Sequence, residues 1–225
     1  NGNICDVVLH RTSRGPCWAT SKSEMFKCIS GRYCTELLEC REMKDGVHCW
    51  SIKVVQQCDS VWLGVATTKC TDENDPLQER TINTLVDVTQ WLGKQDCGWV
   101  YGSNGSSCHA FGQDRGPYDY SLPVYERGSI VKFKLDLTRQ GTLTASVGTS
   151  VGQSAEFIVF DNMLIDDEDI DKQLQQPHPE LKIMKRSFVP AVSLKAPGKV
   201  QFLGFHPASF RTSLGRGRLS ANNPS

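Results

Sequence analysis

Residues 128–148 read GSIVKFKLDLTRQGTLTASVG, and this stretch decides the expected fold. Apolar and polar residues alternate from Val131 to Leu137, which is typical of a half-buried strand. The alternation returns over residues 142–147, after the short loop Arg139-Gln140-Gly141. Two alternating runs joined by a glycine-containing loop predict an antiparallel hairpin. Gly128 precedes the first run, where a tight turn favours a residue that adopts positive φ.

Further strand-like runs lie on both sides of this hairpin, separated by turn residues at spacings of roughly ten residues. Residues 44–46, Lys-Asp-Gly, are interpreted as a tight hairpin turn that follows a strand at residues 35–41. Residues 4–9 are expected to form a short edge strand, and residues 166–176 the one short helix. The sequence therefore predicts an all-β fold, a two-sheet antiparallel β-sandwich.

Several short motifs, in order and spacing, resemble those of the SPRY domain, the core of the B30.2 family. They are residues 46–54 (GVHCWSIKV), 61–66 (VWLGVA), 92–99 (LGKQDCGW), 141–143 (GTL) and 188–194 (FVPAVSL). Ser51 and Ser129 stand where that family usually has acidic residues, so the chain resembles a divergent member. The resemblance implies a concanavalin-like sandwich, in agreement with the strand pattern.

The resemblance covers about residues 15–205, and the domain organisation is expected to follow it. Residues 1–14 are interpreted as an N-terminal extension, residues 161–186 as an acidic insertion within the sandwich, and residues 206–225 as a flexible tail rich in Ser, Arg and Gly. Because the chain begins at Asn1 rather than at Met, we expect it to be a piece of a larger polypeptide.

Charge and cysteine content restrict the functional classes. Lys and Arg together number 25, as do Asp and Glu, so the net charge gives no support for nucleic-acid binding. No apolar run approaches the length of a membrane span, and we expect no membrane association. Ten cysteines could form a disulfide framework, but we favour reduced, partly buried thiols and an intracellular, cytoplasmic location. Asn104-Gly105-Ser106 fits a glycosylation sequon and is interpreted as a turn.

No metal, cofactor or catalytic site is expected. Cys28, Cys34 and Cys40 recur every six residues, which is not the spacing of a zinc knuckle. The acidic run at residues 166–171 has EF-hand spacing at its start but lacks the required glycine and the final glutamate. The sequence has no nucleophile elbow, and its five histidines are scattered. We therefore expect a non-catalytic domain.

Aromatic residues give the main binding candidates. Trp50, Trp62 and Trp99 fall in strands and are expected in the core, whereas aromatic residues in loops beside arginine resemble interface anchors. SPRY domains bind peptides or partner domains through loops at one end of the sandwich. The resemblance places one pocket wall at Val88 and Trp91 and the other at Lys195-Ala196-Pro197. The candidate partner-binding residues are Val88, Trp91, Arg115, Tyr118, Tyr120, Lys195, Ala196 and Pro197.

The expected partner is therefore a protein or a linear peptide. The tryptophan usual in the second wall is absent, which implies a specificity different from the best-known members. The leading hypothesis is a binding module that recruits a substrate within a larger protein. A ubiquitin ligase is one candidate for that larger protein, since many SPRY-containing proteins are ubiquitin ligases or their substrate receptors. Two alternatives stay open, an extracellular lectin-like or laminin-G-like sandwich and a structural domain inside a giant protein.

Overall fold

The structure, a computed structural model, describes residues 24–27, 33–38, 42–57, 60–71, 86–87, 90–110, 121–165 and 185–207. The expected strand at residues 4–9, the expected helix at residues 166–176 and most of the expected tail lie outside these ranges. No helix in the described part of the chain is long and apolar enough to cross a membrane.

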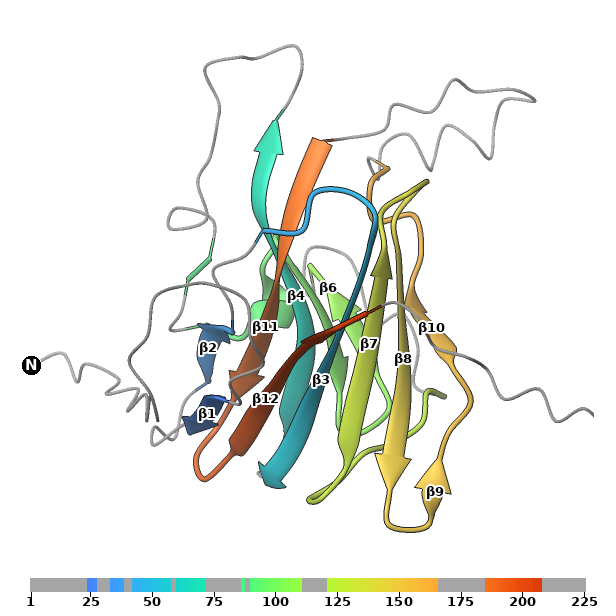
Figure 1. The fold of residues 1–225 in the computed structure, drawn as a ribbon. Coiled ribbons are helices and arrows are strands. Elements are labelled where there is room, and N and C mark those ends of the chain that lie inside the picture. Colours follow the sequence, from blue (N-terminus) through green and yellow to red (C-terminus); the bar gives the residue numbers. More distant parts are fainter. Residues whose placement is uncertain are drawn as a thin grey trace, which may run out of the picture.

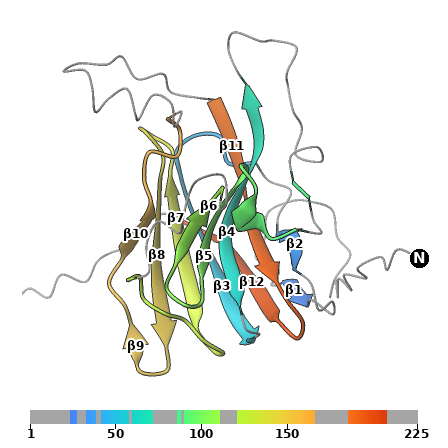
Figure 2. The same ribbon diagram turned by 180° about the vertical axis from the view of Figure 1, so that it is seen from behind.

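Two antiparallel sheets form a sandwich, as the sequence predicts (Figures 1 and 2). The seven-stranded sheet has the order β1-β12-β3-β7-β8-β10, with β9 paired to β8, and the five-stranded sheet has the order β2-β11-β4-β5-β6. The strands of the first sheet are β1 (Glu24–Lys27), β3 (Val47–Gln56), β7 (Ile130–Asp136), β8 (Thr142–Thr149), β9 (Gly152–Gln153), β10 (Phe157–Phe160) and β12 (Lys199–His206). Those of the second are β2 (Cys34–Leu37), β4 (Val61–Thr71), β5 (Gly98–Gly102), β6 (Ser107–His109) and β11 (Lys185–Leu194). A single turn of 3₁₀ helix, η1, covers Leu92–Lys94.

The hairpin predicted from residues 128–148 is confirmed as β7 and β8. Phe133 pairs with Ala145 and Leu135 with Leu143, so the alternating apolar residues of both strands share the inner face of the sheet. Gly128 has φ of +92°, a conformation that side-chain-bearing residues rarely adopt. The local pattern was sufficient here because both strands and their turn are contiguous in sequence.

The predicted hairpin turn at residues 44–46 is wrong. Gly46 does bend the chain, with φ of +73°, but the strands on its two sides belong to different sheets. The preceding strand ends at Leu37, Met43 forms an isolated bridge to Phe188 of β11, and β3 then starts in the opposite sheet. Turn residues indicate where a chain bends, but they do not indicate which sheet the next strand joins.

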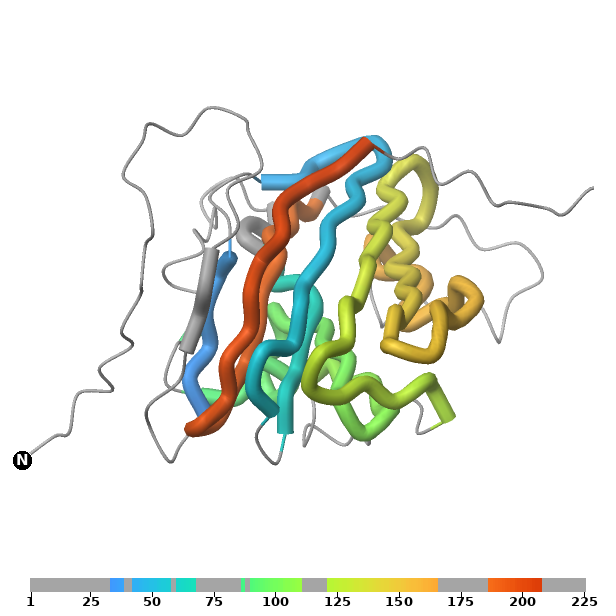
Figure 3. The backbone as a smooth tube through the Cα atoms, turned by 60° about the horizontal axis from the view of Figure 1, so that its bottom comes forward, coloured from blue at the N-terminus to red at the C-terminus, as the bar shows by residue number. Residues whose placement is uncertain are grey.

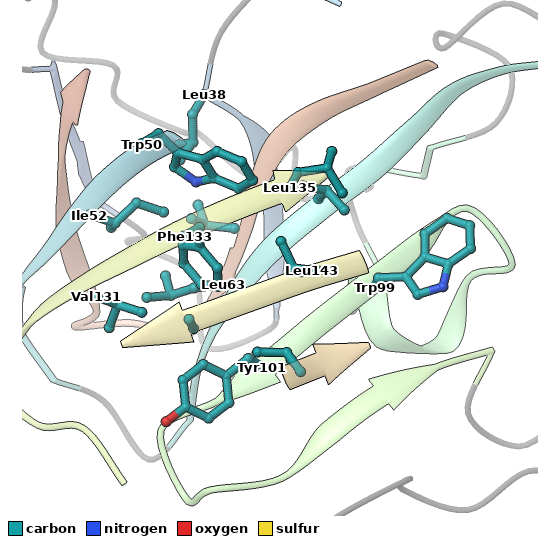
Figure 4. Packing of buried hydrophobic residues seen from close by; sticks show 14 of the residues in the cluster. Leu38, Trp50, Ile52, Leu63, Trp99, Tyr101, Val131, Phe133, Leu135 and Leu143 are labelled. Carbon is teal, nitrogen blue, oxygen red and sulfur yellow. The ribbon is translucent and has the colours of Figure 1, made fainter. Parts of the chain in front are cut away.

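The main core fills the space between the sheets (Figure 4). Trp50 of β3 is fully buried and stacks on Phe133 of β7, with ring centroids 5.3 Å apart. From the opposite sheet, Trp99 packs edge-on against Phe188, and Tyr101 belongs to the same cluster. Apolar burial on this scale is the main force holding two sheets together.

A second, smaller core lies on the outer face of the five-stranded sheet. Trp62 and Ala66 of β4 and Val100 of β5 point away from the main core and are covered by Leu92 of η1 and by Cys97. Trp62 is therefore buried as expected, at 7% exposure, but it belongs to this second core. The segment that contains η1 is thus attached to a rigid sheet by its own apolar contacts.

Candidate binding site

Two buried hydroxyl groups attach the segment before η1 to the five-stranded sheet. Thr35 of β2 and Ser193 of β11 are paired in register, both fully buried, and their hydroxyl groups are hydrogen-bonded. The Thr35 hydroxyl donates to the Gln90 carbonyl at 2.6 Å, and the Leu92 N–H donates to Ser193 Oγ at 2.9 Å. Trp91 lies between these two anchored backbone groups, so its position is fixed by the sheet below it.

The indole of Trp91 packs on two aromatic rings. Its centroid is 4.7 Å from that of Trp62, at an interplanar angle of 54°, and 6.0 Å from that of Tyr33, in a stacked arrangement. Trp62 is buried, whereas Tyr33 and Trp91 are partly exposed. A rigid aromatic ring that is packed by its neighbours and partly exposed to solvent can anchor a partner at low entropic cost.

The turn between β11 and β12 reaches the same aromatic surface. Leu194 pairs with Cys34 at the end of β2, which brings Lys195 next to Tyr33, and the Lys195 ammonium lies 4.7 Å from the Tyr33 ring centroid. Figure 3 shows this turn, where the orange and red tubes meet, at the same end of the sandwich as β2. We call Tyr33, Trp91 and Lys195 the Trp91 patch.

The structure therefore brings together predicted candidates that lie more than a hundred residues apart in sequence. Trp91 and Lys195 contact the same tyrosine, and Ala196 and Pro197 continue the surface along the turn, with Pro197 exposed. The Gly198 N–H donates to the Lys195 carbonyl at 2.6 Å and closes this turn. The other candidates lie outside the described residues; they are Val88, Arg115, Tyr118 and Tyr120.

Tyr33 was missed at the sequence level, although it connects the two halves of the patch. Its position depends on the register between β2 and β11, strands whose paired residues are more than 150 positions apart in sequence. No local pattern carries that register. The only signal available was an aromatic residue directly before a strand of the expected sandwich.

Gly93 offers a test of the patch geometry that needs no ligand. A Cβ atom at this position would lie 2.6 Å from Cζ2 and 2.8 Å from Cε2 of the Trp91 indole. We expect Gly93→Ala to displace the indole and to change the near-ultraviolet circular dichroism of the Trp62–Trp91 pair, while the protein stays folded. Gly148→Ala is the control, because its Cβ would meet only Ile130 O at 3.5 Å. An unchanged spectrum for Gly93→Ala would contradict the described packing of Trp91.

Polar groups gather on the outer face of the other sheet, near the opposite end of the sandwich. A surface hollow of about 410 Å³ is lined by Lys134, Asp136, Arg139, Thr138, Thr142 and Thr144. The Asp136 carboxylate accepts hydrogen bonds from the side chain and the backbone N–H of Thr138, and these lower its pKa. Lys134 lies 3.5 Å from Glu156, so this lysine of the hollow is already paired with a carboxylate.

The same face carries a Ser–His contact. Ser51 Oγ of β3 lies 3.2 Å from Nε2 of His206 on the neighbouring strand β12. The pKa of His206 is lowered mainly by burial and, to a smaller extent, by the positive charge of nearby Lys132. Within the described residues there is no group of three or more His, Cys, Asp or Glu side chains that could hold a metal ion.

Four cysteines in the described residues are buried and form no disulfide bond. Cys34, Cys49, Cys97 and Cys108 occupy the two cores or the face of a sheet, which confirms for these four the expectation of buried thiols. Burial raises the pKa of Cys97 to about 12 and that of Cys108 to about 11. Both thiols therefore stay protonated at neutral pH, and their role is packing.

This protonation gives a pH-dependent prediction. Cys97 and Cys108 have folded-state pKa values above the ordinary value of 9.0, so only the unfolded chain loses these protons just above that pH. The contribution of the two protonated thiols to folding stability is therefore complete below pH 9. We expect the free energy of unfolding to fall as pH rises from about 9 to about 12.

At pH 8 we expect site-resolved alkylation, read by mass spectrometry, to modify both cysteines far more slowly in the folded than in the urea-unfolded chain. Equal rates in the two states would show that these thiols are not buried.

Comparisons with known proteins agree with the fold. No protein-family model matches the sequence, and no curated protein matches it significantly in sequence. The structure is similar to the SPRY domain of human HERC1, with a TM-score of 0.50, 14% identity, and coverage of 83% of this chain and 90% of that one. Weaker similarity extends to a galectin-like protein of unknown function from Bacillus subtilis, with a TM-score of 0.40, 10% identity, and coverage of 81% and 80%. The Emp46p carbohydrate recognition domain gives a TM-score of 0.37 at 7% identity, with coverage of 82% and 77%.

Proposed function

We propose that this chain is a divergent SPRY domain that binds a segment of a partner protein at the Trp91 patch. The observation that carries the proposal is that Trp91 and Lys195, from distant parts of the sequence, contact the same Tyr33 ring at one end of a rigid sandwich. Tryptophan and tyrosine side chains held on a rigid surface are typical of interaction hot spots. The resemblance of the sequence motifs and the similarity of the fold support the same assignment.

The proposed mechanism is recognition without chemistry. The sheet holds Trp91 through Thr35 and Ser193, so little conformational entropy is lost when a ligand covers the indole. Loops and turns at the ends of strands change readily in sequence while the strands keep their positions. The Trp91 patch is accordingly a place where specificity can differ from that of other SPRY domains without a change in the fold.

Selection of ligands from a displayed library of random peptides tests this function directly. We expect the immobilised wild-type chain to select peptides that do not bind Trp91→Ala but do bind Ile158→Ala. Ile158 is the matched control because it is also apolar and exposed, at 58%, but lies on β10 of the other sheet. Peptides that bind both variants equally would place recognition elsewhere and would refute the proposed site.

The proposal extends to the setting of the domain. Free buried thiols in the described residues support a reducing, intracellular compartment. Within its parent protein the domain would recruit a substrate, and a ubiquitin ligase is the setting that the SPRY resemblance favours. Mass spectrometry of the parent purified from its native source, with and without a reductant, tests the compartment, since native disulfides would place the protein in an oxidising environment.

A further inference from the structure

Lys195 is the charged member of the Trp91 patch, and its position is fixed. The turn that carries it is closed by the hydrogen bond from the Gly198 N–H to the Lys195 carbonyl. Its ammonium lies over the Tyr33 ring, and its side chain is partly buried. A cation held over an aromatic ring is partly desolvated, so it interacts more strongly with an added anion than a fully solvated lysine does.

The described residues provide no carboxylate within ion-pair distance of this ammonium. By contrast, Lys44 lies 3.2 Å from Glu42 and Lys134 lies 3.5 Å from Glu156. In the segment that carries Trp91, the Asp87 carboxylate accepts a hydrogen bond from Gln90 Nε2 at 2.7 Å. The patch therefore combines a partly exposed aromatic surface with a cation whose only described partner is the tyrosine ring.

We infer that the ligand segment is acidic: a carboxylate of the ligand pairs with Lys195 while a neighbouring apolar side chain covers Trp91. This inference rests on the proposed function and specifies the chemistry of its ligand. Tyr33 lies between the two anchors and contacts both, so the carboxylate and the apolar group must be close together in the bound segment. An aspartate or glutamate within a residue or two of a leucine, isoleucine or proline has this arrangement.

The same peptide selection tests the inference when Lys195 variants are added. We expect peptides selected on the wild-type chain to share an acidic residue at one position beside an apolar one. Replacing that acidic residue with alanine, or changing Lys195→Glu, should weaken binding by about tenfold or more, as for a charge-assisted hydrogen bond. Lys195→Arg should retain most of the affinity, since the charge is preserved. A peptide with lysine in place of the acid should bind Lys195→Glu better than it binds the wild type.

The possible outcomes separate the ligand chemistry from the binding function. Two results would overturn the inference of an acidic ligand and leave the proposed function standing. In the first, the selected peptides require Trp91 but share no acidic residue. In the second, they bind Lys195→Glu as well as they bind the wild type. A selection that yields no Trp91-dependent peptide would refute the proposed function, and the inference with it. Urea unfolding of every variant identifies substitutions that weaken binding by destabilising the fold. Lys195 lies on a surface turn, so substitutions there are expected to change the free energy of unfolding little.

Discussion

Gly64→Ala is expected to destabilise the fold by about 3 kcal/mol or more, at the upper end of the cost of overpacking. Gly64 lies within β4, paired with Val100 of β5 on one side and Ala191 of β11 on the other. A Cβ atom there would lie 2.0 Å from the Trp99 carbonyl oxygen and 3.0 Å from Val100 Cα. Both are backbone atoms in the centre of a sheet, so neither can move without breaking strand pairs.

Urea and thermal unfolding measure this effect. For a chain of this size, about 3 kcal/mol corresponds to a decrease in Tm of roughly 6–12 °C. Gly148→Ala in β8 is the matched control, because the nearest atom to its Cβ would be Ile130 O at an ordinary 3.5 Å. A Gly64→Ala protein as stable as this control would show that β4 and β5 do not approach as closely as described.

Trp91→Ala is expected to weaken binding of a selected peptide by about 30-fold or more, the effect of removing a hot-spot aromatic residue. The indole presents a fixed surface, held by backbone hydrogen bonds on both sides of the residue and by the Trp62 ring beneath. Alanine at this position would keep the backbone anchors but leave the ligand without its main apolar contact.

The change in affinity must be separated from a change in stability. Trp91→Ala removes the stacking on Trp62 and Tyr33 together with part of the apolar area buried in the second core. We expect this to lower stability by about 2 kcal/mol and to leave the domain folded. Calorimetric titration of the peptide, together with urea unfolding of the same samples, measures the two effects. A Trp91→Ala protein with wild-type affinity would exclude the indole as an anchor, whatever its effect on stability.

Much of the fold was predictable because its signals are local. The alternation in residues 131–137 and 142–147 identified two strands, their turn and their inner faces without reference to the rest of the chain. The tryptophans expected in the core are buried, and the turn at Asn104 joins β5 to β6. Gly64 lies in the motif at residues 61–66, but the sequence did not show why glycine is needed there. The structure shows that the Trp99 carbonyl oxygen occupies the space that a Cβ atom would take.

The remainder depends on pairings between distant segments. The bend at Gly46 was read as a hairpin because nothing in residues 42–48 indicates that β3 joins the opposite sheet. Trp62 was expected in the core, but that expectation did not distinguish the inner from the outer face of its sheet. Two of the three residues of the Trp91 patch, Trp91 and Lys195, were predicted from the resemblance. The position of Tyr33 could not be predicted, because it depends on the register of β2 with β11.

Mapping a bound peptide by nuclear magnetic resonance tests the central claim most directly. A selected peptide is titrated into isotopically labelled protein, and the amide and indole resonances are followed. We expect the largest shifts at the Trp91 indole and at the backbone amides of Tyr33 and Lys195. Shifts confined to the polar hollow around Lys134 and Arg139, at the other end of the sandwich, would contradict the assignment of the Trp91 patch as the binding site.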